Sequence, residues 1–545
     1  MADAQSRRLI HPNTRDKMTS TASLWATYEL SFAGPAGGNP FADVTLSAVF
    51  AQGERQVAVT GFYDGEGRYL VRFLPDTTGP WSWSTRSNAP ALDKQSGTLD
   101  VGAAEPGHHG PVRVDRRHHF RYADGTRYIN IGTTAYVWNL QGDALEEETL
   151  ATLAKAPFTK IRMCVFPKHY RYNENEPDRY PYELLAKGKS KWDGRFGVTD
   201  HGWQFDFSRF NPDYFRHLEK RINQLAAIGV EADLIIFHPY DRWGFSKLTP
   251  AQDDAYLRYL TARLSALPNV WWSMANEYDL MPQKSLADWD RFIGIVANND
   301  PYGHLLSVHN CFKFYDHTDP RISHASIQRS AASNSALWRE KFGKPVSIDE
   351  CCYEGDIGEL WGNITAQKMV RRFWDGTVNG GYVTHGETYY NDSETLWWAK
   401  GGKLTGESVA RIAFLRRIME EGPDEGLDPV KSTGAYRLAM VGGHDNVVVQ
   451  QLFVPPAGEE SWSRVQAWWA TAGQPHKYYL SYLGENQARE FAVVVPPDEK
   501  YDAMLIDTWE MTETPVGQGV VRGDVLAIPA KPYQAVLLRR AEGDR

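Results

Sequence analysis

Short runs in which apolar and polar residues alternate fill the first hundred positions of the chain. Turn residues separate these runs, which cover residues 44–50, 56–63 and 69–73. A period of two is typical of strands that bury one face, and no helical periodicity interrupts the series. We therefore predict an N-terminal β-sandwich over residues 21–105, preceded by a flexible polar tail at 1–20.

Over the next three hundred residues, apolar strand-like runs alternate with amphipathic helices. The runs lie at 128–132, 160–165, 231–237, 270–274, 305–309, 322–327, 345–349 and 382–385. Several helices have a readable start, such as Asn211-Pro212, or the capping box that Thr249 and Gln252 would form. Eight such units predict a (β/α)8 barrel over residues 106–424. A doubly wound sheet is the alternative, but no strand leads into a Gly-rich phosphate loop.

Alternating strands return after residue 425. The clearest runs lie at 446–452, 478–483, 492–495 and 535–538. They predict a second β-sandwich over residues 425–545. The expected fold class is therefore α/β: a TIM barrel flanked by N-terminal and C-terminal β-sandwich domains.

Composition narrows the class of function. The 545 residues carry 59 Lys and Arg against 68 Asp and Glu, a net charge of −9 that disfavours nucleic acid as a partner. No run approaches the ~20 apolar residues of a membrane span, and no signal peptide is visible, so we expect a cytoplasmic protein. The four cysteines lack zinc-type spacing, and no cofactor is expected. The 19 tryptophans suggest sugar binding, because flat rings bind the apolar faces of sugars.

Two glutamates stand where barrel enzymes keep their catalytic groups, at the carboxyl ends of strands. The apolar fourth run leads into Asn276-Glu277, and the seventh ends at Glu350. Across a barrel mouth, two carboxylates can flank one glycosidic bond, one protonating the leaving oxygen and the other attacking the anomeric carbon. Asn276 could then bind a sugar hydroxyl. The alternative is that either glutamate is a structural ion-pair partner.

These motifs resemble a known family. Residues 271–277 (WWSMANE) and 344–350 (KPVSIDE) resemble the strand-four and strand-seven motifs of the clan A glycoside hydrolases. The first strand and the domain order are similar to those of the apiosidase-like barrels within that group. The resemblance implies that Glu277 is the acid/base and Glu350 the nucleophile of a retaining reaction. Thr133 and Tyr136 stand where the family usually has Asp and Trp, so its branched-pentose substrate is not carried over.

Other strand ends supply candidate pocket groups. Arg162 on the second strand could orient the nucleophile, or be part of a buried ion pair. Glu354 is a competing nucleophile because of its short spacing from Glu350. The groups that could bind substrate hydroxyls or stack on a sugar ring, each with core packing or a local hydrogen bond as the alternative, are Trp138, His238, Trp243, His309, Glu387, Tyr389 and Trp397.

Two other functions remain open. A metal-dependent hydrolase could use His238, Asp241, His309 and His385, but the first strand lacks a His-x-His pair and both glutamates would be unexplained. A catalytically silent carbohydrate-binding protein is the second alternative. We expect a carbohydrate substrate. A long insertion at 170–193 could close one end of the cleft and favour exo action on short oligosaccharides or glycosides. The oligomeric state is not predicted.

Overall fold

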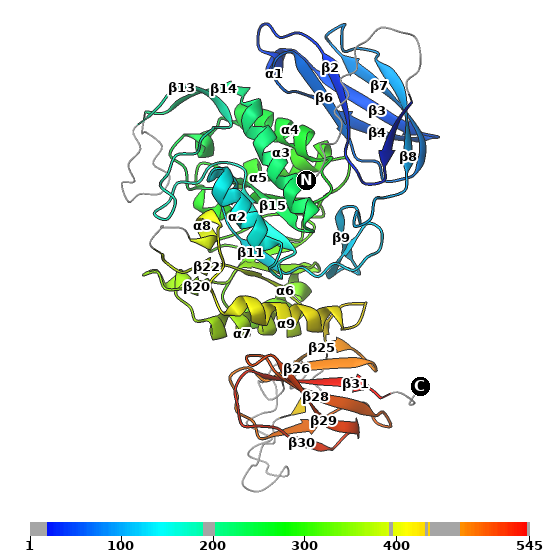
Figure 1. Ribbon diagram of the computed structural model, residues 1–545, viewed down its shortest axis with the longest axis vertical. Helices are drawn as coiled ribbons and strands as arrows, with labels where there is room; N and C mark the ends of the chain where they lie inside the picture. The colour runs from blue at the N-terminus through cyan, green and yellow to red at the C-terminus, as the bar shows by residue number, and fades with distance from the viewer. Residues whose placement is uncertain (1–18, 189–201, 392–395, 431–433, 436–468, 542–545) are drawn as a thin grey trace.

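The computed structural model describes residues 19–188, 202–391, 396–430, 434–435 and 469–541. The N-terminal β domain, the barrel and the C-terminal β domain follow one another along the long axis of the molecule (Figure 1). The predicted tail up to residue 18, the end of the predicted insertion and the predicted strand at 446–452 lie outside the described residues.

The N-terminal domain is a sandwich of two sheets. The first has the strand order β1 (Thr19–Ser23), β8 (Ser96–Gly102), β7 (Gly79–Ser87), β3 (Leu46–Gln52), β4 (Arg55–Thr60), and the second β2 (Tyr28–Ala33), β6 (Arg68–Phe73), β5 (Phe62–Tyr63). The short helix α1 (Pro40–Asp43) precedes β3. Inward-facing side chains meet between the sheets, where the rings of Phe50 and Phe73 stack with centroids 4.0 Å apart. Alternate burial along β3 explains why the period-two pattern was readable.

Eight parallel strands form the barrel. Their spatial order is β17 (Leu306–Ser307), β16 (Val270–Ala275), β15 (Glu231–Phe237), β12 (Lys160–Cys164), β11 (Gly132–Thr134), β21 (Tyr382–His385), β19 (Val346–Glu350) and β18 (Ala325–Gln328). A parallel bridge between His309 and Ser326 joins the two ends of this order. The predicted α/β barrel with a β domain at each end is therefore confirmed.

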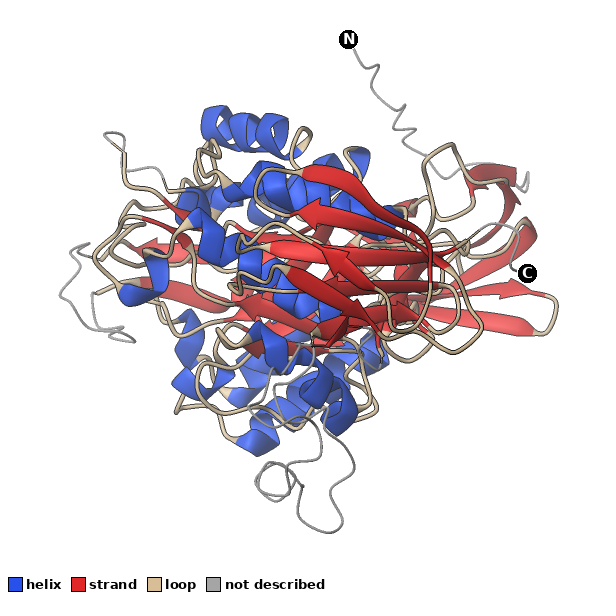
Figure 2. Cartoon of the chain, turned by 90° about the horizontal axis from the view of Figure 1, so that it is seen from below, coloured by secondary structure: helices blue, strands red, loops and turns tan. Residues whose placement is uncertain are grey.

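Helices flank the strands (Figure 2). They are α2 (Asp143–Leu153), α3 (Pro212–Ala227), α4 (Pro250–Leu264), α5 (Leu286–Asn299), α6 (Ser335–Phe342), α7 (Ala366–Val378), α8 (Trp397–Lys400) and α9 (Ser408–Glu420). The predicted capping box at Thr249 is present, with Gln252 reciprocating. No helix occurs between β17 and β18. Within the described ranges, no helix has the length and apolar character needed to cross a bilayer.

Smaller elements decorate the loops at the carboxyl ends of the barrel strands. The insertion after β12 holds the hairpin β13 (Tyr182–Ala186) and β14 (Gln204–Phe210), and the parallel pair β20 (Glu354–Gly355) and β22 (Glu387–Thr388) links the loops after β19 and β21. Single 3-10 turns are η1 (Trp138–Leu140), η2 (Phe245–Lys247), η3 (Tyr278–Leu280), η4 (Ala332–Asn334) and η5 (Leu360–Gly362).

Buried polar contacts fix the N-terminal domain to the barrel. Arg72 on β6 pairs with Glu219 on α3 at 2.8 Å and also donates to the carbonyl of Arg263 on α4 at 2.8 Å. Arg263 in turn pairs with Asp64 of the N-terminal domain at 2.7 Å. The hairpin of β9 (Val112–Asp115) and β10 (His119–Tyr122) leads from that domain into the barrel.

The C-terminal domain packs below α7 and α9 in Figure 1. Its larger sheet has the order β23 (Asp428–Pro429), β25 (Ala470–Gln474), β26 (Tyr478–Tyr482), β31 (Gln534–Arg540), β28 (Tyr501–Asp507), β29 (Thr512–Val520), and the smaller β24 (Gly434–Ala435), β27 (Glu490–Val493), β30 (Val525–Ala527). Trp374 on α7 stacks on Tyr482 with centroids 5.4 Å apart. This contact belongs to a core that runs from the barrel to the outer face of the larger sheet, while the opposite face packs against the smaller sheet.

Candidate active site

Glu277 follows directly on β16, at the carboxyl end of a strand that is buried along its whole length. Its backbone is left-handed, with φ = 57°, a conformation that costs a non-glycine residue about 1 kcal/mol or more. The N–H of Glu277 donates to Nδ1 of His309 at 3.3 Å, and Tyr240 donates its hydroxyl to the Glu277 carboxylate. The side chain is only 5% exposed. Such strain and burial are typical of a functional group held by its surroundings.

Glu350 is the last residue of β19, three strands away from β16 around the closed barrel. Its carboxylate accepts a hydrogen bond from the hydroxyl of Tyr136, and Arg162 on β12 approaches it at 3.4 Å. Nε2 of His309 lies 3.9 Å from the same carboxylate. Glu350 is 7% exposed. The carboxylate is thus held in place by a phenol and a cation, as an attacking group must be.

Asn276 connects the two glutamates. Its Nδ2 donates to Oε2 of Glu277 at 3.2 Å, while its Oδ1 accepts from Tyr136 and from Arg162, both at 3.2 Å. Tyr136 and Arg162 are also the groups that contact Glu350. One hydrogen-bonded path therefore runs from one carboxylate to the other through a single amide, and both face the same space.

The surroundings of Glu277 favour its protonated form. Burial, reinforced by the nearby negative charge of Glu350, raises the pKa of Glu277 to about 7, although its hydrogen bond with Tyr240 and the charge of Lys168 oppose the rise. A carboxyl with this pKa is substantially protonated near neutral pH and can act as an acid. His309 is buried beside Arg162, and both effects hold its pKa well below the usual range, so it stays neutral.

A buried charge network lies beneath the glutamates. Lys160 contacts Asp349 at 2.7 Å and Asp233 at 3.1 Å, and Asp233 lies 3.8 Å from Arg162. Burial opposes ionisation of Asp349, but Lys160 and Arg162 outweigh it and hold its pKa far below the usual range. The network places the negative charge of Asp233 beside the Nε of Arg162, whereas Glu350 contacts Nη1 of the same guanidinium.

Several residues around the glutamates were not predicted as site residues. Tyr136 and Tyr240 donate to Glu350 and Glu277, the hydroxyl of Tyr353 lies 3.4 Å from that of Tyr136, and the charge of Lys168 acts on Glu277. A sequence signal existed for the network below them: Lys160 and Arg162 alternate along an otherwise apolar strand, opposite Glu231 and Asp233. The tyrosines and Lys168 lie on loops, where no periodicity marks which side chains turn inward.

The three tryptophans predicted to stack on sugar are buried inside the protein, which corrects that prediction. Trp138 has no exposed surface. Trp243 packs on Phe245 and donates to Glu176 at 3.0 Å. Trp397 is buried and donates to the hydroxyl of Thr133 at 2.8 Å. These rings support the walls of the barrel mouth and leave no face for a ligand.

Glu354, Glu387 and Tyr389 form a separate structural cluster at the start of α9. Glu354 accepts from the Glu407 N–H at 2.9 Å and from Tyr389 at 3.0 Å. Glu387 accepts from the Gly406 N–H at 2.8 Å, where a Cβ would lie 2.7 Å from both carboxylates. These acids satisfy the amino-terminal N–H groups of the helix region, which gives them a structural role, and substrate binding by Glu354, Glu387 and Tyr389 stays a prediction. As an alternative nucleophile, Glu354 is disfavoured.

The four groups considered for a metal-dependent hydrolase do not converge. His238 contacts the carbonyl of Phe166, Asp241 accepts three backbone N–H groups of its own loop, and His385 contacts Thr133. In the described part of the chain, the only three-residue set with ligand atoms within 4.8 Å of one another is Asp143, Glu146 and His217, and Arg221 already pairs with its two acids. His238 therefore makes a structural contact with the loop after β12 and does not belong to a metal centre.

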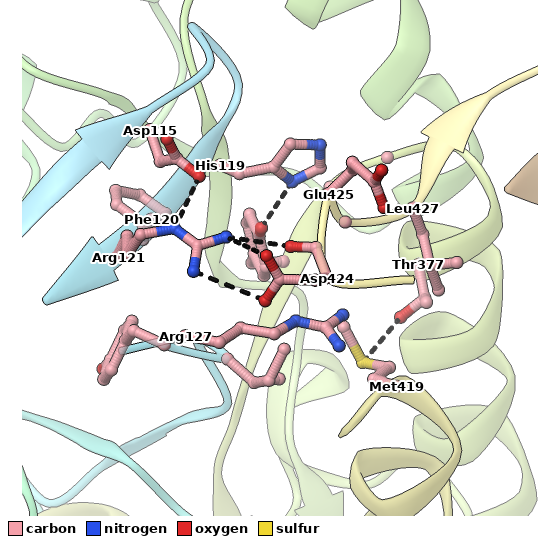
Figure 3. A pocket seen from close by; sticks show the side chains of 16 residues that line it. Asp115, His119, Phe120, Arg121, Arg127, Thr377, Met419, Asp424, Glu425 and Leu427 are labelled. Carbon is pink, nitrogen blue, oxygen red and sulfur yellow. Dashed lines mark hydrogen bonds and ion pairs between the residues drawn. The ribbon is translucent and has the colours of Figure 1, made fainter. Parts of the chain in front are cut away.

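A small pocket lies at the opposite end of the barrel (Figure 3). It is lined by the β9–β10 hairpin, the start of β21 and the segment after α9, and its cavity of about 20 Å³ has room for about one water molecule. Arg121 contacts Asp115 and Asp424 across it, both at 3.0 Å. These ion pairs fasten the barrel floor, far from the strand ends that carry Glu277 and Glu350.

Comparison with known proteins agrees with this geometry. The profile of the apiosidase-like catalytic domain matches residues 114–423, more than half of the chain. The chain belongs to the apiosidase-like family. Domains of unknown function named DUF5060 and DUF5605 match the flanking residues 21–88 and 468–539. None of the curated proteins matches.

Solved structures extend the comparison. A protein of Bacteroides vulgatus ATCC 8482, assigned provisionally to the glycoside hydrolases, is 36% identical, with a TM-score of 0.83 over 96% of this chain and all of that one. A family 5 glycoside hydrolase of the same organism is 15% identical, with a TM-score of 0.55 over 80% of this chain and 94% of that one, a likeness of fold alone. The barrel of this apiosidase-like protein is thus a glycoside hydrolase-like catalytic domain, and that class of enzyme acts on carbohydrate.

Proposed function

We propose that the protein is a retaining glycoside hydrolase that removes terminal residues from short oligosaccharides or glycosides. The observation that carries this proposal is the hydrogen-bonded path from Glu277 through Asn276 and Tyr136 to Glu350. The two carboxylates are linked through one amide and one phenol, and they are near enough for the charge of Glu350 to raise the pKa of Glu277. Close spacing, about 5–5.5 Å, favours a covalent intermediate over direct attack by water, which needs about 6.5–9.5 Å.

In the first step, Glu350 attacks the anomeric carbon while Glu277 donates its proton to the glycosidic oxygen. The bond between that carbon and oxygen breaks, the aglycone leaves as an alcohol, and the sugar is esterified to Glu350. Arg162 and Tyr136 hold the attacking oxygen in place. Glu277 meets the requirement for an acid because its pKa is raised to about 7.

In the second step, Glu277 acts as the base. It takes a proton from water as the water oxygen attacks the anomeric carbon, and the ester bond to Glu350 breaks. Esterification has by then removed the negative charge of Glu350, which is one of the causes that raise the pKa of Glu277. The pKa of Glu277 falls accordingly, and the same residue serves as acid and base in turn.

The insertion after β12 supports exo action. Arg171 pairs with Glu359 at 2.8 Å, and Tyr172 donates to the same carboxylate at 2.5 Å. These contacts join the insertion to the loop after β19, and Trp361 from that loop lies against Trp398 with ring centroids 4.8 Å apart. A wall built on one side of the glutamates limits how many sugar units can pass beyond the cleavage point.

A screen of aryl glycosides in pyranose and furanose forms tests the proposal. The first anomer released is identified by NMR before mutarotation, and a product of the same configuration as the substrate is expected. An inverted first product, or sugar binding without turnover by the wild-type protein, would overturn it. The second outcome would favour a catalytically silent carbohydrate-binding protein.

A further inference from the structure

Lys168 sits in an aromatic cage next to the two glutamates. It lies in the loop after β12 and is 4% exposed. Its ammonium lies 3.5 Å from the ring centroid of Tyr136, 4.2 Å from that of Tyr240 and 4.8 Å from that of Trp398. Such contacts are electrostatic, and they strengthen where the cation has lost its water. The cage therefore holds a positive charge inside the barrel mouth by contact with aromatic rings.

Two walls of this cage are the tyrosines that hold the glutamates. Tyr136 donates its hydroxyl to Glu350, and Tyr240 donates its hydroxyl to Glu277. Each phenol presents its face to the Lys168 ammonium and its edge to one carboxylate. Lys168 thus contacts both tyrosines, and moving its side chain would disturb the two glutamates together.

Backbone hydrogen bonds fix the parts of the cage. The N–H of His169, next to Lys168, donates to the carbonyl of Tyr240 at 2.9 Å. The N–H of Tyr136 donates to the carbonyl of Trp398 at 2.9 Å. Asn173 donates through Nδ2 to the carbonyl of Lys168 at 2.6 Å. The loops after β11, β12 and β15 and the helix α8 are therefore joined around the ammonium, which fits a built feature better than an incidental contact.

The charged groups around Lys168 indicate that its ammonium acts on Glu277. Burial lowers the pKa of Lys168 to about 8, opposed by Cys164, Glu277 and Glu350 and assisted by Arg162. No acid of the described segments pairs with it within 4.0 Å. His238, also buried nearby, has its pKa lowered to about 3 and is neutral.

The groups that face Glu277 from its other neighbours are Tyr170, Tyr240, Cys311, Gln328 and Glu350. Lys168 is the cation that most affects the charge on Glu277.

We propose that Lys168 is a positioning residue that sets the geometry of both glutamates through Tyr136 and Tyr240 and stabilises the ionised form of Glu277. This role deepens the proposed glycoside hydrolysis and rests on it. When Glu277 has given up its proton, Tyr240 donates to the new anion and Lys168 supplies a positive charge on the far face of that phenol. A cation on the ring also makes the phenol a stronger donor.

Lys168→Met and Lys168→Arg test this role, because Met keeps length without charge and Arg keeps the charge. In Lys168→Met, the ionised form of Glu277 loses support, so the basic limb of the pH profile of kcat/KM moves upward by about one pH unit. We expect kcat to fall about tenfold with little change in KM, since positioning acts on the transition state. Lys168→Arg should restore the position of the limb.

A readout without turnover separates this proposal from the proposed function. NMR titration of glutamate labelled at its carboxyl carbon, assigned by the signal lost in Glu277→Gln, should show the Glu277 midpoint rising in Lys168→Met. If the wild-type protein cleaves no glycoside, the proposed function fails while the titration still decides the electrostatic role of Lys168. An unchanged midpoint, or a raised KM with unchanged kcat, would overturn the role argued here.

Lys284→Met is the matched control. Lys284 is also a buried lysine, but it pairs with Asp253 at 2.5 Å and donates to the carbonyl of Leu248 at 2.7 Å, away from the glutamates. Its loss should lower the melting temperature and leave the pH profile and the Glu277 midpoint in place. If Lys284→Met moved the midpoint as much as Lys168→Met, the effect would be general destabilisation, and the proposal would be wrong.

Discussion

Asn276 donates a hydrogen bond of 3.2 Å to the carboxylate of the residue that follows it, Glu277. Glu277 makes this contact from a left-handed backbone, with φ = 57°. The other end of the same amide accepts from Tyr136 and Arg162, the two partners of Glu350. The Asn-Glu pair therefore serves as a bridge between the two carboxylates as well as the source of one of them.

Glu277→Gln should affect substrates according to their leaving groups. The amide keeps the shape of the side chain and its contact with Tyr240 but cannot donate an acidic proton. Cleavage of alkyl glycosides should fall by about 10²–10⁴, whereas first-step cleavage of aryl glycosides with activated leaving groups should fall much less. Pre-steady-state measurement of aglycone release on both classes checks this. Equal losses on both would contradict the acid role.

Glu350→Ala should abolish turnover, because Glu350 is the carboxylate that Tyr136 and Arg162 hold for attack. A small anion such as azide could occupy the space left by the side chain and restore partial activity with an inverted product, identified by NMR. Glu354→Ala is the matched control. Glu354 satisfies backbone N–H groups at the start of α9, so its loss should lower stability. Azide should not increase the activity of this control or invert its product. A dead Glu354→Ala beside an active Glu350→Ala would transfer the nucleophile role to Glu354.

The barrel could be predicted because apolar runs mark its strands and capping residues mark its helices within short stretches of sequence. β15 and β21 have the predicted bounds, and the cap at Thr249 lies where the box pattern indicates. Boundaries were missed where tertiary contacts decide them. The first barrel strand begins at Gly132 because the backbone of β11 pairs with β12 and β21 there, and the preceding apolar residues pack without pairing.

The site was predictable only where strands end. Glu277 and Glu350 follow buried strands, so their common edge of the barrel could be inferred from the sequence. The tryptophan predictions failed because the sequence pattern is the same for two cases. A ring buried in the barrel wall and a ring exposed to a ligand cannot be told apart from it. Tyr136 illustrates the remaining gap: it departs from the family motif, and only the folded chain shows that its hydroxyl reaches Glu350.

Tyr136→Phe isolates the contribution of that hydroxyl. The ring remains to form the cage wall, but Glu350 and the Oδ1 of Asn276 each lose a donor. A hydrogen bond to a charged group is worth about 1.5–3 kcal/mol, so kcat/KM should fall about 10–100-fold. Steady-state kinetics on one aryl glycoside checks this. Trp397→Phe, which removes a buried contact with Thr133, should change stability more than kcat/KM, and the reverse order would contradict this assignment.

Glu277→Gln should also make the protein more stable at alkaline pH. The pKa of Glu277 is raised to about 7 in the folded state, from 4.5 for an ordinary glutamate. Below pH 4.5 the carboxyl is protonated in both states and costs nothing. Between pH 4.5 and 7 the unfolded chain ionises first, so stability is lost as the pH rises, and above pH 7 the full penalty remains.

The expected gain for Glu277→Gln above pH 7 is about 2–3 kcal/mol, falling toward zero near pH 4. Denaturant unfolding of the two proteins at pH 4, 6 and 8 measures it, and the pH 4 pair is the internal control for any packing change. A constant difference at all three pH values would mean that the substitution changes packing and that Glu277 is not held in a protonated state by its site. A difference that grows with pH would show that the fold gives up stability to keep an acid ready for catalysis.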